Sequence, residues 1–234
     1  DNPTAARWLS EEEKDTITRR IAGENRVEHR ILWRALRDPR IIGMGLVNFG
    51  ILAGTNSVNL WLPQIVKAMG FSTGATGLVV AVPNVASVVA MTLWGRDSDA
   101  RRERIWHIAI PTLIASTSFF VASLTQIDLV MLIALGLTQV VLWSSIAPLI
   151  SLPSSFLGGS AAAGGIALVV SIGQVGSFIG STLIGVLRER TGDYGAAMAA
   201  IGIILALATL IALWLGRALS GRQQAPQAQA SRAH

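Results

Sequence analysis

Uncharged polar side chains inside long apolar runs are the residues of this chain best placed to do chemistry. Among them are amides and hydroxyls at Asn48, Asn56, Asn59, Asn84, Ser87, Gln139, Ser144, Ser145, Ser171, Gln174 and Ser177. Each amide carries two hydrogen-bond donors and an acceptor oxygen, and leaving these groups unpaired in an apolar medium is costly. A hydrogen bond between helices satisfies them as well as a ligand does. The residues alone therefore leave both interpretations open.

Acid–base, metal and phosphate chemistry are not indicated. The sequence has no Cys, no His spacing typical of a metal site and no Ser/His/Asp arrangement. The Gly-rich run at 158–165 lacks the Lys-Ser/Thr ending and the preceding strand of a phosphate-binding loop. His107 stands in the first turn of an apolar run, so we predict a surface or headgroup role for it rather than a proton relay. We expect no enzymatic activity, no cofactor and no metal.

The composition is that of a membrane protein. Of the 234 residues, 51% are hydrophobic and only 14% are charged, whereas soluble domains carry roughly a quarter charged residues. The mean hydropathy is +0.53. Six runs reach the ~20 residues that a membrane-spanning helix needs, namely Ile41–Val66, Thr73–Trp94, Ile105–Thr125, Leu129–Ile150, Ala161–Leu187 and Gly195–Leu215.

The sequence therefore predicts an all-α integral membrane protein with three parts. Residues 1–40 are polar and basic, and a capping box at Ser10 and Glu13 predicts an amphipathic helix there. Residues 41–216 form a bundle of six transmembrane helices. Residues 217–234 are rich in Gln and Ala and are expected to form a disordered tail.

The positive charges predict how the bundle is oriented. Cytoplasmic loops of membrane proteins carry an excess of Lys and Arg. Sixteen of the 19 Lys and Arg residues fall in the two terminal regions and in the connection at 95–104, which all lie on one side of six spans. Only Lys67, Arg188 and Arg190 fall on the other side. We expect both termini to be cytoplasmic in a cell inner (plasma) membrane, with the lipid bilayer and not nucleic acid as the partner of the basic charge.

Small residues in the stretch from Trp143 to Gly185 predict close helix packing. Gly176 and Gly180 form a GxxxG pair, and a second stripe of small residues follows the same helical spacing at Gly173, Ser177, Ser181 and Gly185. In membranes, small residues let the backbones of two helices approach closely. We therefore expect the helix at 161–187 to lie tightly against a neighbour.

The connection at 95–104 carries the pattern Gly-Arg-Asp-Ser-Asp-Ala-Arg-Arg-Glu-Arg. Its charges alone are explained by anchoring at the cytoplasmic surface. The spacing of its Gly, acid and Arg residues also resembles the loop motif of the major facilitator superfamily. Gly95, Asp99 and Arg104 match the motif's Gly, acid and Arg, whereas Arg102 stands where the motif usually has a second Gly.

The resemblance extends along nearly the whole chain and is most similar to the anion:cation symporter branch of that superfamily. It is carried by Asp1-Asn2-Pro3 with Ala6–Glu12, by Asn59–Lys67, by Ala81-Val82-Pro83 with Leu93–Asp99, and by Leu152–Leu157 with Ala161–Leu168. Asn56, Asn84 and Ile150 stand where the branch often has aromatic residues. Val170 stands where it has an intramembrane Asn.

The resemblance implies the C-terminal six-helix half of a twelve-helix transporter, in which two halves alternate access to a central site. It implies secondary transport of a small organic anion, such as a sugar acid, an aromatic acid or a dicarboxylate, coupled to a proton. Because no charged residue lies deep in the six spans, and such residues normally mark ion pathways, an N-terminal half must supply proton coupling and the cationic anchor.

The resemblance also implies roles for particular residues. The first, fourth and fifth spans face the central cavity in this family, which makes Asn56, Asn59, Gln139, Trp143, Ser144, Ser171 and Gln174 the candidate substrate-binding residues. Gly95, Asp99 and Arg104 would form a conformational latch. Two alternatives stay open, which are transport of a neutral sugar or drug-like solute in the same fold, and a membrane scaffold half that transports nothing.

Overall fold

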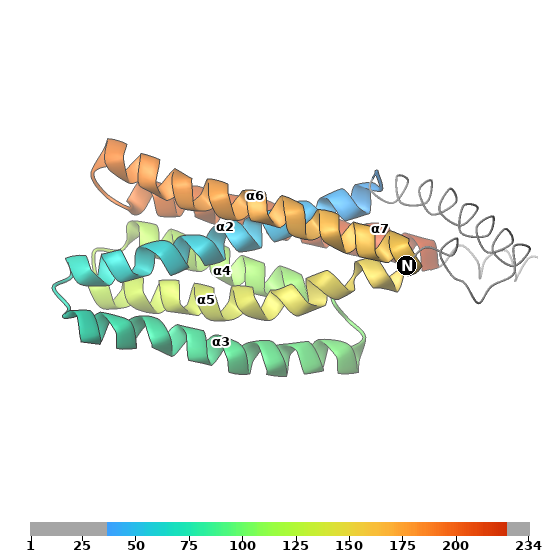
Figure 1. The fold of residues 1–234 in the computed structure, drawn as a ribbon, viewed down its shortest axis with the longest axis horizontal. Coiled ribbons are helices and arrows are strands. Elements are labelled where there is room, and N and C mark those ends of the chain that lie inside the picture. The colour runs from blue at the N-terminus through green and yellow to red at the C-terminus, as the bar shows by residue number, and fades with distance from the viewer. Residues whose placement is uncertain (1–36, 224–234) are drawn as a thin grey trace, which may run out of the picture.

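The computed structural model describes residues 37–223, which form a bundle of long helices that run side by side (Figure 1). The elements are α2 (Pro39–Ala68), α3 (Thr73–Arg101), α4 (Trp106–Leu124), α5 (Asp128–Ser151), the short 3₁₀ helix η2 (Pro153–Ser155), α6 (Gly159–Thr191) and α7 (Gly195–Gln223). Six of them are long and apolar enough to cross a membrane. The six predicted spans and the all-α fold are confirmed.

The helix ends follow from local sequence signals. Asp38 precedes α2, where its carboxylate accepts the backbone N–H of Arg40 at 2.9 Å, and Pro39 opens the helix at a position that needs no N–H donor. The side chain of Ser72 caps α3 in the same way. Gly192 ends α6 with φ +81°, a left-handed conformation that costs little without a side chain.

The charged stretch after Trp94 is helical for longer than the apolar pattern predicts. α3 continues to Arg101, because the residues that follow Trp94 satisfy each other on the helix surface. Arg101 donates to Asp97, one turn earlier, at 2.9 Å. Most of the predicted connection at 95–104 is therefore the last two turns of α3.

The C-terminal helix also passes its predicted end. α7 runs on to Gln223 instead of ending near Leu215. The helix therefore includes residues 217–223, because hydropathy marks where apolar residues end and not where the helix ends. The rest of that tail and the amphipathic helix predicted within residues 1–36 lie outside the described residues.

The closest helix pair is α2 with α6, and small residues make it possible. A side chain added at Gly180 would lie 2.7 Å from the backbone oxygen of Ala53 on α2, and one at Gly176 would collide with the backbone of Phe49. The second stripe also faces α2, because Gly185 adjoins the ring of Trp61. The predicted close packing of this helix is confirmed.

The remaining helices pack as α4 with α7, α5 between α3 and α4, and α2 beside α7. Buried apolar side chains such as Phe119, Leu142 and Leu205 fill the centre. α3 and α6, in contrast, leave large apolar side chains such as Val82 and Phe178 exposed. These two helices need apolar surroundings outside the six-helix bundle.

Each helix runs from one end of the bundle to the other, so the connections between helices lie at these two ends (Figure 1). One end holds the α3–α4 turn, the α5–α6 connection and the start of α2. The opposite end holds the α2–α3, α4–α5 and α6–α7 turns. We call them the α3–α4 end and the α6–α7 end.

Candidate functional site

Three amides from three helices meet inside the bundle and form what we call the amide cluster. Gln139 on α5 donates from Nε2 to Oδ1 of Asn59 on α2 at 2.7 Å and to Oδ1 of Asn84 on α3 at 3.4 Å. Each lies about ten residues from the α6–α7 end of its helix, so the cluster is well inside the apolar length of the bundle. It is a polar site within an apolar medium.

Close helix approaches position this cluster. Gly136, one turn before Gln139, has Pro83 at 3.2 Å from where a side chain would begin, which brings α3 against α5 next to Asn84. Gly54 on α2 likewise adjoins Leu142 on α5, at 2.8 Å. Larger residues at either glycine would hold the helices, and therefore the amides, apart.

The cluster has both a buried part and an accessible part. Gln139 is only 1% exposed, and its Oε1 has no hydrogen-bond partner within residues 37–223. Asn59 is exposed. Because its Oδ1 is held by Gln139, Asn59 presents its NH₂ group outward as a donor. Pro63, which lacks an N–H, also leaves the backbone carbonyl of Asn59 without its usual helical partner.

The other candidate substrate-binding residues do not join the cluster through any hydrogen bond in the described part of the chain. Asn56 and Ser144 bond to backbone carbonyls of their own helices, at Leu52 (3.2 Å) and Val141 (2.7 Å). Trp143 is half-buried on α5, and Ser171 and Gln174 are exposed on α6. The structure therefore brings together Asn59 and Gln139, and it adds Asn84, which was not among the candidates.

The three candidate residues at 95–104 lie around the α3–α4 turn with unequal contacts. Arg104 donates to the backbone oxygen of Ser151 at the end of α5 at 2.7 Å. Its distance to Asp99 is longer, at 3.7 Å, and the Asp99 side chain is 75% exposed. Gly95 lies within α3. Arg102 takes the left-handed conformation at φ +52°, so the turn is tight although the residue is not glycine.

His107 is the polar centre of this turn, and its predicted surface role is wrong. Its side chain is only 8% exposed. Nε2 lies 2.9 Å from Oδ2 of Asp97, and Nδ1 lies 3.1 Å from Oε2 of Glu103. The ring of Trp94 covers it at a centroid distance of 5.0 Å. The four-residue spacing of Glu103 and His107 could indicate their contact from the sequence alone. The contact with Asp97 could not be predicted, because it depends on how α3 packs against α4.

The charges of this turn support one another. The pKa of Asp97 is lowered below its ordinary value, first by its hydrogen bond with His107 and then by the one with Arg101. The α3–α4 turn is therefore held by an alternation of acidic and basic groups from α3 and the start of α4.

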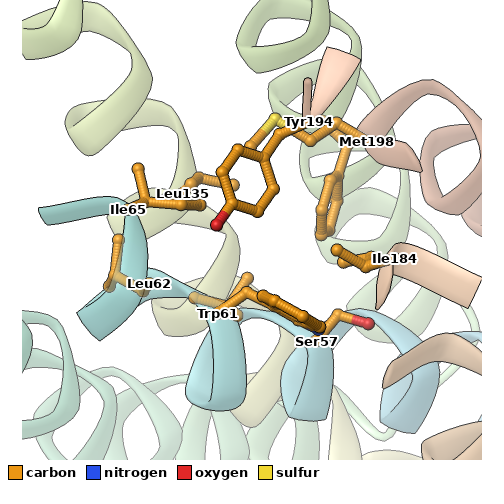
Figure 2. Close-up of a pocket in the computed structure, with 10 residues that line it drawn as sticks. Ser57, Trp61, Leu62, Ile65, Leu135, Ile184, Tyr194 and Met198 are labelled. Carbon is orange, nitrogen blue, oxygen red and sulfur yellow. The ribbon is translucent and has the colours of Figure 1, made fainter. Parts of the chain in front are cut away.

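A small apolar pocket lies near the α6–α7 end (Figure 2). Its free space is about the size of one water molecule. It is lined by Ser57, Val58, Trp61, Leu62, Ile65, Phe119, Leu135, Ile184, Tyr194 and Met198. No sequence pattern indicates this pocket, because its walls come from five helices that approach one another only in the fold. Within the described residues, no group of acidic, His or Cys side chains could hold a metal ion.

Comparisons with known proteins match this chain along most of its length. The family model described as Major Facilitator Superfamily matches residues 3–181. A putative tartrate transporter of Agrobacterium vitis is 38% identical over 222 residues, which cover 93% of this chain and 49% of that protein.

Two further relatives are also matched over slightly less than half of their own length. A quinolone resistance transporter of Acinetobacter baumannii is 28% identical over 210 residues, or 88% of this chain and 48% of that protein. The inner membrane transport protein RhmT of Escherichia coli is 31% identical over 194 residues, or 78% and 43%. The chain thus spans about half the length of these relatives.

Proposed function

Because the chain belongs to the major facilitator superfamily, we propose that it forms the C-terminal six-helix half of a secondary active transporter for a small organic anion. The names of its relatives support this class of substrate, since one of them is a putative tartrate transporter. In such a carrier two halves rock about a site near the middle of the membrane. The substrate would be a sugar acid, an aromatic acid or a dicarboxylate.

The amide cluster is the observation that carries this proposal. Its outward NH₂ group on Asn59 suits a carboxylate or another acceptor, and the buried amide of Gln139 holds Asn59 in place. Asn56, Trp143, Ser144, Ser171 and Gln174 would complete the walls of the substrate site in conformations that turn them toward it. Neutral donors suffice in this half if a cation in the other half pairs with the negative charge of the substrate.

The N-terminal half supplies what this half lacks. None of the six spans contains an Asp, Glu, Lys or Arg deep inside, whereas proton pathways in membranes use such groups. The proton-coupling group and the cation that anchors the anion are therefore assigned to the other half. The exposed apolar faces of α3 and α6 support contact with that half or with lipid.

The α3–α4 turn acts as the latch that stabilises one state of the carrier. Gly95, Asp99 and Arg104 form it together with His107 and its carboxylates, and Arg104 ties the turn to the end of α5. This end faces the cytoplasm of the cell inner membrane, as the excess of Lys and Arg there supports.

A substitution at the latch tests its role. Asp99→Asn removes the charge that faces Arg104 while keeping the size of the side chain, so we expect lower transport with normal amounts of carrier at the membrane. Uptake and surface expression are measured on the same cells. Unchanged uptake would remove Asp99 from the latch.

The substrate class is tested by uptake with the carrier that contains both halves. A panel of labelled tartrate, gluconate, succinate and benzoate is offered with and without an inward proton gradient. We expect saturable uptake of at least one anion, and competition by others, that rises with the gradient. Absence of uptake and of competition for every anion in the panel would refute the organic-anion proposal.

Transport of a drug-like solute is the second candidate. It is favoured by the similarity to a quinolone resistance transporter, and a neutral amide cluster suits an uncharged solute as well as an anion. Cells that produce the carrier would then tolerate more quinolone than cells without it, and would show no anion uptake.

A further inference from the structure

Arg188, in the last turn of α6, lies against two aromatic rings at the α6–α7 end. The centre of its guanidinium is 4.6 Å from the ring centroid of Tyr194 and 5.7 Å from that of Trp61. The two rings meet edge to face, with centroids 6.0 Å apart. Cation–π attraction at these distances holds the guanidinium in one place.

The rings themselves are fixed by the helices. The indole N–H of Trp61 donates to the backbone oxygen of Ser181 on α6 at 3.1 Å. Gly185 leaves room for the same ring, which lies 3.2 Å from where a side chain would begin. Tyr194 stands at the start of α7, where its carbonyl accepts the N–H of Met198 at 2.9 Å. Arg188 therefore rests on a rigid aromatic support that joins α2, α6 and α7.

The N–H donors of the Arg188 guanidinium are not used within the described residues. Within residues 37–223, no hydrogen bond or ion pair involves the Arg188 side chain, although it is half-buried. The carboxylate of Asp193, five residues further along the chain, accepts the backbone N–H of Gly195 at 2.7 Å. Arg40 and Arg101, by contrast, each pair with an aspartate. A guanidinium carries five N–H donors in a planar fork that matches a carboxylate or a phosphate.

Two hydroxyls behind the rings also lack partners. Ser57 is fully buried, and neither its Oγ nor the Tyr194 hydroxyl has a hydrogen-bond partner in the described residues. In Figure 2 the Tyr194 hydroxyl points into the pocket, toward Leu62 and Ile65. Burial raises the pKa of Tyr194, so its hydroxyl keeps its proton at neutral pH. Buried polar groups without partners are rare in proteins and mark places where a small polar molecule can bind.

We infer that Arg188, Trp61 and Tyr194 form an oxyanion-binding site at the α6–α7 end, distinct from the amide cluster, which takes the carboxylate of a small organic acid. The inference rests on the proposed function for the identity of the acid. It follows from the guanidinium, which has no hydrogen-bond or ion-pair partner within residues 37–223, and from its fixed aromatic support. A lipid headgroup phosphate presents the same chemistry, and the experiment separates the two sources.

The test compares Arg188→Gln with Arg190→Gln in the carrier that contains both halves. Arg190 lies two residues further along, is exposed and touches neither ring, so its substitution controls for the loss of one positive charge. Titration calorimetry with tartrate and with benzoate gives the Kd of each protein in neutral detergent. Losing a charge-assisted hydrogen bond predicts a Kd about tenfold higher for Arg188→Gln, and no change for Arg190→Gln. Arg188→Lys, which keeps the charge, checks that the fold survives at this position.

Each outcome decides the inference. A selective rise in Kd for either acid supports the carboxylate site. A second outcome is that Arg188→Gln changes the Kd of neither acid, but that anionic phosphatidylglycerol vesicles raise the melting temperature of the wild type and not of Arg188→Gln. The oxyanion is then a lipid phosphate. Equal effects of both Gln variants, or no effect in either assay, overturn the site. Binding of an acid without any uptake would refute the transport proposal and leave this site standing.

Discussion

At the scale of single residues, the α3–α4 turn depends on His107, whose two ring nitrogens face two different carboxylates. Asp97 is held by two basic partners, whereas Asp99 is mostly exposed and 3.7 Å from its only ion-pair partner in the described chain. Mostly exposed ion pairs contribute little to stability. The two aspartates, two residues apart, therefore have different roles.

We predict that Asp97→Asn lowers the melting temperature of the carrier more than Asp99→Asn does. Because the pKa of Asp97 in the folded state lies below its ordinary value of 3.8, the stability that its charge contributes is complete above that value. It is lost as the pH falls through the folded-state pKa. Melting curves from pH 7 down to pH 3 would show the gap between wild type and Asp97→Asn narrowing only at the acid end. A gap that narrows already between pH 7 and pH 5 would contradict this assignment.

The amide cluster gives a second prediction at this scale. Gln139→Glu keeps the shape but removes the N–H donors that hold Asn59, and it places a carboxylate against two amide oxygens. A lost or unsatisfied buried hydrogen bond costs ~1–3 kcal/mol, which predicts an apparent affinity for the transported anion about tenfold weaker. Ser145→Ala is the matched control on the same helix, because Ser145 bonds only to its own helix at Leu142. Equal KM values for the two variants would remove Gln139 from the site.

At the scale of the elements, the contact between α2 and α6 is set by glycines. A methyl group at Gly180 would lie 2.7 Å from a backbone oxygen of α2, which cannot move without the whole helix. We therefore predict that Gly180→Ala lowers the free energy of unfolding by about 1–3 kcal/mol. Gly77→Ala, on the open face of α3, has no neighbouring atom within 4 Å and should be neutral or stabilising by up to ~1 kcal/mol. Thermal unfolding in detergent measures both, and equal melting temperatures would refute the packing role.

The same elements show how far the sequence leads. Apolar length predicts the six helices, and the spacing of Gly176 and Gly180 predicts a close helix contact, because both are properties of one helix. Which helix is the partner, and how each helix is rotated about its axis, cannot be predicted in this way. A helix that is apolar on all sides has no pattern that indicates which face is covered. For this reason Asn59 and Gln139 were found as candidates but their direct bond was not.

Residues missed by the pattern illustrate the same limit. The sequence identifies Asn84 as a polar residue inside a span but not as a candidate for the substrate site, because its place beside Gln139 depends on the approach of α3 at Gly136. The sequence predicts a surface role for His107 because its partner Asp97 lies on another helix. Contacts between residues of two different helices can be identified only once the positions of the helices are known.

At the scale of the whole molecule, the six helices enclose a polar cluster and leave α3 and α6 apolar and uncovered. The chain spans about half of its relatives, and its spans hold no deep charge. Under the proposed function, such a half would provide neutral hydrogen-bonding groups and a latch, and a second half would supply proton coupling. Transport is thus proposed as a property of the two halves together.

The most direct test measures proton-driven uptake in liposomes. Purified carrier with both halves and the six-helix chain alone are reconstituted in parallel, and uptake of labelled tartrate, gluconate, succinate and benzoate is followed with an inward proton gradient. We predict saturable, gradient-dependent uptake of at least one of these anions by the complete carrier, and none by the six-helix chain. Failure of the complete carrier to take up any of them, or equal uptake by the six-helix chain alone, would contradict the account.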